Sequence, residues 1–320
     1  KVSIRGDDSS VSSKFGGHIF INSLGRPSYV YLERVEITRM GQQDMPRRHP
    51  LNFLNELTGA ESAVTKCSIH HTYNRGIVLE NSNRIRISET FVVDTIGHGI
   101  SLYGGASRFN QLYANFVYIT RPGLNLDQVV ASMHISHPSN ILIENTLGGS
   151  AHMGLWLNFE DSAADPSFGS VCPSQGQLGY EETDPIATNK FPWTGGVYHS
   201  NGMHGIWVYP KHYARTTECG SSDFAANPIV SSTFYRPFSF LNGGQGIALE
   251  SVANYHFSSY RASGSRDIEP VKLYDNGDAG IGVNEILHGT VTFTGVLCVA
   301  HSTFFTPTQF KPLRPTVGVF

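Results

Sequence analysis

One short pattern of apolar residues recurs along the chain: a glycine, an aliphatic residue, any residue and a second aliphatic residue. Two aliphatic residues spaced by two positions point to the same side of a strand. The glycine before them permits a tight bend where the strand begins. The pattern occurs, the last time loosely, at residues 75–79 (RGIVL), 98–102 (HGISL), 153–157 (MGLWL), 204–208 (HGIWV), 245–249 (QGIAL) and 279–283 (AGIGV). The sequence therefore predicts a series of short strands that occupy equivalent places in the fold.

The spacing of the pattern predicts an all-β solenoid. Gly76 and Gly99 are 23 residues apart, which is the length of one coil of a β-helix, and the later gaps of 55, 51, 41 and 34 residues allow two coils or one coil with an insertion. A single coil exposes too much apolar surface to fold alone, so successive coils are expected to stack at about 4.8 Å and pair strand on strand. We therefore predict a right-handed parallel β-helix, with a β-sandwich as the alternative.

Two segments interrupt the period. Residues 158–196 and 210–230 are rich in Gly, Pro and Ser and are expected to be long loops inserted into one domain that spans residues 1–320. Such loops either carry function or shield one flank of the solenoid. Because the chain opens on a strand-like segment without a signal peptide, we expect it to be a fragment of a larger extracellular protein.

Composition excludes several classes of function. Charged residues make up 15% of the chain, the formal charge is −3 and the pI is near 6.5, none of which suits a nucleic-acid-binding protein. The basic cluster at residues 47–49 is expected to be a solvated turn. The sequence holds no apolar run of the roughly 18 residues that a membrane helix needs, so we expect no membrane insertion by this segment.

The four cysteines divide into two pairs. Cys67 and Cys298 lie in apolar, strand-like runs and are expected to be small buried residues. Cys172 and Cys219 lie in the two long loops, where a disulfide between them would fit an oxidising compartment, with free loop thiols as the alternative. None has CxxC spacing, so no metal site is predicted. Scattered carboxylates such as Asp275 give only a weak calcium signal, and no cofactor is expected.

The first third of the chain resembles the parallel β-helix region of the G8-domain ectoproteins. This family contains fibrocystin, fibrocystin-L and cell-surface hyaluronidases of the cell-migration-inducing type. The phrases that carry the resemblance are residues 35–43 (VEITRMGQQ), 67–75 (CSIHHTYNR) and 94–98 (DTIGH). The resemblance implies a β-helix at the cell surface, and the rest of the chain resembles the family only through the repeat.

One departure from the family bears on activity. After the Met-Gly-Gln phrase the family typically reads Arg-Tyr-Pro-Ile-His-Phe-His, whereas residues 48–54 of this chain read RHPLNFL. Asn52 and Leu54 thus stand where the family has two histidines. Asn cannot act as a general base near neutral pH and Leu cannot ligate a metal. The sequence therefore gives more support to a protein without enzymatic activity than to an enzyme.

Several residues remain candidates for chemistry or binding. If the chain cleaves a polysaccharide, Asp94, His98 and Arg75 are the expected catalytic residues. For ligand binding the candidates are Trp156 and Trp207, which occupy the outward position between the two aliphatic residues, together with His204. Cover by a loop for the tryptophans, and hydrogen bonding within its own turn for His204, are the alternatives.

Two hypotheses of function follow. The first is a structural or adhesive β-helix segment of a large extracellular, cell-surface, ciliary or flagellar coat protein. Its partners would be neighbouring domains of the same parent chain, coat or filament subunits, or a polysaccharide, because an open end of a β-helix is an unpaired sheet edge. The second is a polysaccharide-cleaving enzyme related to the hyaluronidases, or an inactive descendant of one.

Overall fold

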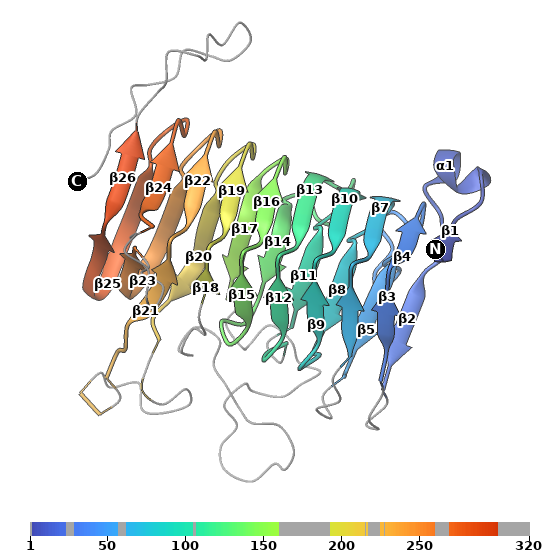
Figure 1. Cartoon of the computed structure of the whole chain (residues 1–320), viewed down its shortest axis with the longest axis horizontal. Helices are drawn as coiled ribbons and strands as arrows, with labels where there is room; N and C mark the ends of the chain where they lie inside the picture. Colours follow the sequence, from blue (N-terminus) through green and yellow to red (C-terminus); the bar gives the residue numbers. More distant parts are fainter. Residues whose placement is uncertain are drawn as a thin grey trace, which may run out of the picture.

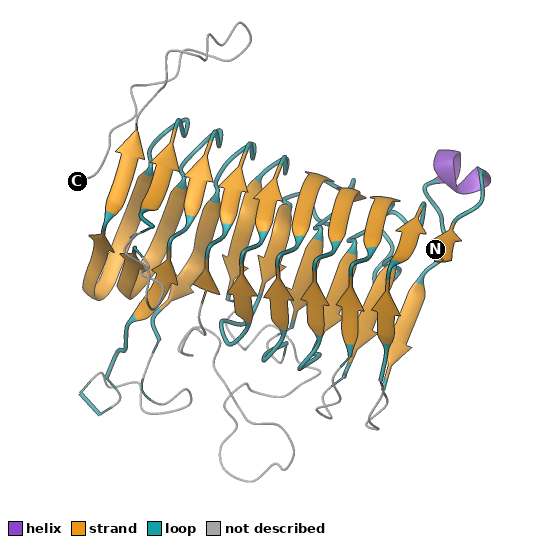
Figure 2. Ribbon diagram, in the orientation of Figure 1, coloured by secondary structure: helices purple, strands orange, loops and turns teal. Residues whose placement is uncertain are grey.

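The computed structural model describes residues 2–23, 29–56, 62–104, 107–159, 193–214, 216, 225–226, 228–259 and 269–299. Across these residues the chain winds into a rod of stacked coils, and each coil contributes strands to three faces (Figures 1 and 2). The paired strands run parallel, which confirms the predicted parallel β-helix and excludes the β-sandwich. The described part contains no helix that is both long and apolar enough to cross a membrane.

Face 1 is a ten-stranded parallel sheet. Its strands in spatial order are β1 (Val2–Arg5), β4 (Val35–Thr38), β7 (Ser68–Thr72), β10 (Phe91–Ile96), β13 (Phe116–Arg121), β16 (Thr146–Gly148), β19 (Val197–His199), β22 (Phe238–Phe240), β24 (Val271–Tyr274) and β26 (Val296–Val299). The short helix α1 (Ser9–Ser13) follows β1 at the N-terminal end of the rod (Figure 1).

Faces 2 and 3 belong to one sixteen-stranded sheet that folds around the rod. Face 2 contains β2 (Ile19–Asn22), β5 (Leu51–Leu54), β8 (Ile77–Glu80), β11 (Ile100–Tyr103), β14 (Ala131–Ile135), β17 (Met153–Asn158) and β20 (Ile206–His212). Face 3 contains β3 (Tyr31–Glu33), β6 (Ala63–Thr65), β9 (Arg86–Ser88), β12 (Gln111–Tyr113), β15 (Ile141–Ile143), β18 (Trp193–Thr194) and β21 (Ser232–Tyr235). The long strands β23 (Ile247–Ser258) and β25 (Ile281–Thr294) join the two faces at the C-terminal end.

The first aliphatic residue of each repeat forms a continuous ladder on the inner side of face 2. Register places Ile77, Ile100, Met133, Leu155 and Ile206 on successive coils, and each of them is fully buried. The 55-residue gap between glycines therefore holds two coils, because Ser132 takes the place of a glycine in the coil between them. The interval from 154 to 205 holds one coil whose insertion lies outside the described residues.

The glycine of the repeat is required for close packing. At Gly154, Gly205 and Gly246 an added Cβ would lie 2.6–2.7 Å from the carbonyl oxygen of the glycine in the next coil. None of these three glycines has a positive φ. Gly205 and Gly246 lie at bends directly before their strands, as expected, and the glycines also keep the coils close together at this corner.

Asparagine ladders fill other corners of the rod. The Asn242 side chain accepts a hydrogen bond from the Asn201 amide nitrogen and donates one to Asn276 Oδ1, both at 2.8 Å. The pairs Asn110–Asn140 and Asn115–Asn145 repeat this contact at 3.0 Å. Each ladder satisfies buried backbone groups where the chain turns between faces.

Candidate functional site

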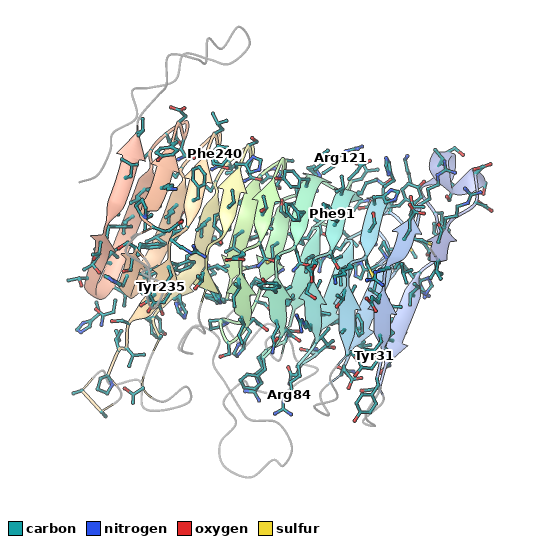
Figure 3. The ribbon with its side chains drawn as sticks, in the orientation of Figure 1. Tyr31, Arg84, Phe91, Arg121, Tyr235 and Phe240 are labelled. Atoms are coloured by element: carbon teal, nitrogen blue, oxygen red, sulfur yellow. The ribbon has the colours of Figure 1, made fainter. Side chains whose placement is uncertain are left out.

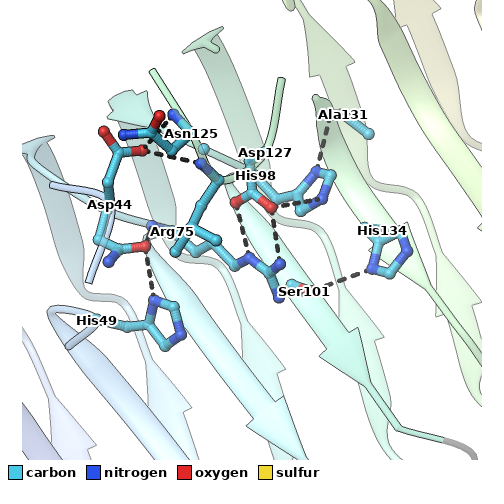
Figure 4. A network of polar contacts seen from close by, with 12 residues as sticks. Asp44, His49, Arg75, His98, Ser101, Asn125, Asp127, Ala131 and His134 are labelled. Atoms are coloured by element: carbon cyan, nitrogen blue, oxygen red, sulfur yellow. Dashed lines mark hydrogen bonds and ion pairs between the residues drawn. The ribbon is translucent and has the colours of Figure 1, made fainter. Parts of the chain in front are cut away.

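Two loops fold over the outer side of face 2 and meet there. One loop, residues 43–50, precedes β5, and the other, residues 122–130, precedes β14. The Asp44 carboxylate in the first loop accepts the backbone N–H groups of Asn125 and Leu126 in the second, both at 3.0 Å (Figure 4). In the first loop Arg47 also donates to Glu80 of β8 at 2.6 Å. The loop that contains the basic cluster is thus fixed on the sheet, with Arg47 and Arg48 exposed as expected of a solvated turn and only His49 buried.

A buried ion pair joins the second loop to the rod. Arg75 donates two hydrogen bonds of 2.7 Å to the two carboxylate oxygens of Asp127, and the side chains are 19% and 8% exposed (Figure 4). Burial alone would raise the pKa of Asp127, but His98 and Arg75 hold it well below the usual range. This bidentate geometry is the strong form of an Arg–carboxylate contact.

His98 lies next to the ion pair with its imidazole neutral. Its Nδ1 accepts the Ala131 N–H at 3.0 Å, so the remaining proton is on Nε2, which lies 3.6 Å from Asp127 Oδ1. The ring stacks on His134 with the centroids 4.6 Å apart. Burial above all lowers the pKa of His98 to about 4. His134 contacts Ser101 Oγ at 3.1 Å, and burial holds its pKa well below the usual value as well.

The position of the missing histidine pair is closed to solvent. Asn52 is fully buried, and its amide nitrogen and oxygen have no hydrogen-bond partner within the described residues. Leu54 is 6% exposed. The neighbouring His49 donates from Nδ1 to Asn74 Oδ1 at 2.8 Å, and burial lowers its pKa to about 3. These side chains therefore offer no accessible base near neutral pH.

An aromatic strip continues along face 2 from this cluster. His134, Trp156 and Trp207 occupy the same outward position on successive coils. The rings of Trp156 and Trp207 stack with centroids 5.4 Å apart, and Tyr209 lies 4.6 Å beyond Trp207. His204 lies 5.9 Å from Trp207, whose Nε1 donates to Glu250 Oε1 at 3.2 Å. The three candidate ligand-binding residues thus form one surface.

The structure separates the three candidate catalytic residues. Arg75 and His98 meet at Asp127, but Asp94 lies on face 1, where it pairs with Arg121 and lies 3.7 Å from His71. Asp94 has a left-handed backbone with φ of 60° within β10, whose pairing with β13 resumes at Thr95. Asp94 thus has its own partners on face 1, apart from the contact of Arg75 and His98 with Asp127.

Sequence reasoning missed several members of the polar cluster, which consists of His49, Arg75, His98, Asp127 and His134. Asp127 lies 52 residues from its partner Arg75 in a loop without a motif, and nothing in the sequence marks the two as neighbours. His134 could have been found, because Ser132, Met133 and Ile135 match the repeat if serine is allowed to replace glycine. His49 belongs to the basic cluster at residues 47–49, and the local sequence does not show that this one member is buried.

The described residues contain no group of three or more His, Cys, Asp or Glu side chains arranged to hold a metal ion. The predicted disulfide between Cys172 and Cys219 falls outside the described residues. Cys67 and Cys298 are free thiols, the first buried and the second half-buried. The chemistry of the described site is therefore that of an ion pair, three neutral imidazoles and an aromatic strip.

Fold and site define a parallel β-helix that carries a closed polar cluster and an aromatic strip on one outer face. A solved structure of a periplasmic alginate epimerase mutant has the same fold, with a TM-score of 0.58 and 10% identity over 92% of this chain and 64% of the epimerase. Residues 14–129 match the family model described as CEMIP beta-helix. This part of the chain is thus similar to a CEMIP-type β-helix, which confirms the predicted resemblance.

Relatives extend the match beyond this region. A cell surface hyaluronidase of Danio rerio is 29% identical over 65% of this chain, and one of Homo sapiens is 32% identical over 65%. Fibrocystin-L of Mus musculus is 26% identical over 69% of this chain. The chain spans only 17% of each hyaluronidase and 5% of fibrocystin-L.

Proposed function

We propose that this chain is a structural or adhesive β-helix segment of a larger cell-surface protein, and that it does not cleave polysaccharide. The observation that carries the proposal is that the polar groups of face 2 are closed to solvent, and that Asn52 and Leu54, which are buried there, occupy the place of the family's paired histidines. The names of the hyaluronidase relatives support a cell-surface location. A ciliary or flagellar coat is a narrower form of the same proposal.

Chemistry on a glycan needs an acid or base that reaches the substrate. His49, His98 and His134 are 6%, 3% and 3% exposed, and burial holds all three neutral. Arg75 and Asp127 satisfy each other through two hydrogen bonds. The cluster therefore serves to fix the two loops on the rod.

The aromatic strip is the surface of face 2 that we assign to adhesion. Trp207 has an apolar ring with the polar groups Glu250 and His204 beside it. Apolar rings flanked by hydrogen-bonding groups suit contact with sugar rings and their hydroxyls. A polysaccharide that lies along the rod is the ligand that this strip favours.

A polysaccharide-cleaving enzyme is the second candidate. It is supported by the convergence of a carboxylate, an imidazole and a guanidinium at Asp127, His98 and Arg75. For these groups to act, the loop of residues 122–130 would have to leave face 2 and break the ion pair. The two functions therefore differ in the free energy needed to open the loop: an enzyme requires an opening that occurs readily, and a structural segment does not.

The proposal is tested by incubating the purified chain with hyaluronan, alginate and polygalacturonate of defined length, and measuring chain length by gel electrophoresis. We expect no shortening. Depolymerisation that is lost in Asp127→Asn and kept in Asp94→Asn would overturn the proposal and establish the enzyme, because only Asp127 contacts the cluster. Thermal unfolding of both variants checks that lost activity does not reflect lost folding.

The adhesive part of the proposal is tested by measuring binding to polysaccharide. Immobilised hyaluronan and alginate are expected to retain the wild-type chain, and retention is expected to fall in Trp207→Ala. The matched control is Tyr31→Ala, an aromatic residue of face 3 that is 67% exposed. Equal retention of both variants would remove the aromatic strip from the proposal.

A further inference from the structure

A second surface lies on face 1, away from the polar cluster. At the N-terminal end of this face a groove of about 500 Å³ opens between α1 and strands β1, β4, β7 and β10. Four basic side chains and two carboxylates line it: Arg5, Lys14, Arg39, Arg121, Glu36 and Asp94. The lining therefore has an excess of two positive charges (4 − 2), although the whole chain has a formal charge of −3.

Both carboxylates of the groove already have cationic or imidazole partners. Asp94 pairs with Arg121, and Glu36 Oε1 lies 3.4 Å from His70 Nε2. Arg39 pairs with Asp8, whose side chain is 94% exposed at the rim. Arg5 and Lys14 also line the groove without an ion-pair partner among the described residues, although Lys14 Nζ lies 5.1 Å from the centre of the Tyr73 ring, and a ligand carboxylate could reach both.

Two outward columns of face 1 lead from this groove into an aromatic surface. One column passes through Glu36, Ser68, Phe91 and Phe116 on successive coils. The other passes through Thr38, His70, Val93 and Tyr118, and continues through Gly148 and His199 to Phe240. Phe91, Phe240 and Arg121 lie along the same side of the rod in Figure 3.

The aromatic surface is partly solvent-exposed and its rings are stacked. Phe91 and Phe116 are 50% and 38% exposed, and their rings lie 5.0 Å apart at 11°. His199 and Phe240 stack at 4.7 Å and 4°. Exposed apolar residues that gather on one face of a rod, rather than singly, indicate a contact surface.

The chemistry of this surface favours a polypeptide over a sugar. The stacked rings of Phe91 and Phe116 carry no hydrogen-bonding atom, whereas Trp207 has Nε1, which donates to Glu250. Apolar side chains of a protein pack well against such ring edges. We propose that face 1 docks an extended protein segment that has acidic residues at one end, bound in the groove, followed by apolar residues that cover the aromatic columns.

This inference goes beyond the proposed function. The docking surface is on face 1, whereas the polar cluster and the aromatic strip are on face 2. The assays with polysaccharides and the assay with peptides can therefore fail separately.

The test selects binders from a display library of random peptides against the purified chain. Selected peptides are expected to be rich in Asp or Glu beside Leu, Ile or Phe. Their affinity is expected to fall at least about tenfold for the double variant Arg5→Glu/Lys14→Glu, since each reversal turns an attraction into a repulsion. A similar loss is expected for Phe91→Ser/Phe116→Ser.

Matched controls use exposed residues away from face 1. Arg84→Glu and Tyr31→Ser alter a charge and an aromatic ring on the opposite side of the rod in Figure 3, and are expected to leave affinity unchanged. Selected peptides without acidic and apolar enrichment, or equal binding by groove and control variants, would overturn the proposal. So would tighter binding of heparin or hyaluronan oligosaccharides at Arg5 and Lys14, which would make the groove a glycan site.

Discussion

At the scale of single residues, burial has taken three histidines of face 2 out of acid–base chemistry. Burial lowers the pKa of His98 to about 4 and that of His49 to about 3, whereas an exposed histidine titrates near 6.5. Between these values the unfolded chain binds protons that the folded chain excludes. The contribution of these residues to the free energy of unfolding is therefore fully present above about pH 6.5. It is lost as the pH falls toward the folded-state pKa values, about 4 for His98 and about 3 for His49.

We expect the urea midpoint to fall on acidification from pH 7.5 to pH 4.5, with a slope of up to about 1.4 kcal/mol per pH unit for each histidine. Asp127, whose pKa is lowered, adds a loss in the same direction only at still lower pH. His98→Gln should reduce the slope, because the amide does not titrate. A midpoint that stays constant between pH 7.5 and 4.5 would contradict the burial of neutral imidazoles.

Asparagine ladders make a second contribution at this scale. Asn242 bonds to Asn201, Asn276 and Ser239 and is 2% exposed. Asn242→Ala would leave buried donors and acceptors on both neighbouring coils unpaired, so we expect a loss of roughly 1–3 kcal/mol in the free energy of unfolding, measured by urea denaturation. The exposed Asn284 bonds to Glu250, and Asn284→Ala is expected to cost less than about 0.5 kcal/mol. Equal losses would show that the ladder contributes nothing beyond a surface contact.

At the scale of elements, the Arg75–Asp127 pair holds the loop of residues 122–130 on face 2. Asp127→Ala leaves a largely buried guanidinium without its partner, and we expect a loss of roughly 3–5 kcal/mol in the free energy of unfolding. Limited proteolysis should then cut within the loop, because its remaining bonds to the rest of the described structure are those to Asp44 and, at its end, those of Val130. Both effects are measured on the purified variant.

The control for the Arg75–Asp127 ion pair is an ion pair of similar type at the surface. Glu144, which is 48% exposed, pairs with Arg236 at 3.0 Å, and Glu144→Ala is expected to cost less than about 1 kcal/mol. The double variant Arg75→Met/Asp127→Leu should recover much of the loss, since it removes both charges. Proteolysis of the loop at the wild-type rate in Asp127→Ala would show that the pair does not hold it.

Strands could be predicted from the sequence where the same residue type occupies the same position of every repeat. The glycine of the repeat identified the face 2 strands β8, β11, β17, β20, β23 and β25, because the close approach of neighbouring coils excludes a side chain there. β14 was missed since Ser132 fills the same place. The columns of left-handed residues at the corners were also missed, because Arg39, His71 and Asp94 adopt positive φ without being glycine.

The candidate site was less predictable because its members come from different coils. Arg75 and His98 share a place in the repeat and were named together, but their common partner Asp127 lies in a loop that belongs to no repeat. Asp94 was grouped with them because it is near His98 in sequence. The turn at residue 97, a glycine with φ of 100°, places the two residues on different faces of the rod. Distance along the chain is therefore a poor guide to distance at a corner of a β-helix.

At the scale of the whole molecule, stability is a sum over coils and their contacts with the coils on either side. Leu102 lies in the middle of a buried ladder that starts at Ile21 and passes through Phe53 and Leu79. Leu102 is fully buried, whereas Ile21 in the first described coil is only partly buried. Within the described residues β2 pairs with β5 alone, so its other edge has no strand.

The rod should therefore be most stable in its middle. We expect backbone amides of β8, β11 and β14 to exchange with deuterium more slowly than those of β2, since opening a central strand breaks two ladders and opening β2 breaks one. Leu102→Ala should cost about 2–5 kcal/mol and Ile21→Ala clearly less, because truncation in the middle leaves a cavity that cannot collapse. Both quantities are measured by hydrogen exchange with mass spectrometry and by urea denaturation. Uniform exchange along the rod, with equal costs for the two truncations, would mean that the coils unfold as one unit and that stability does not depend on position in the stack.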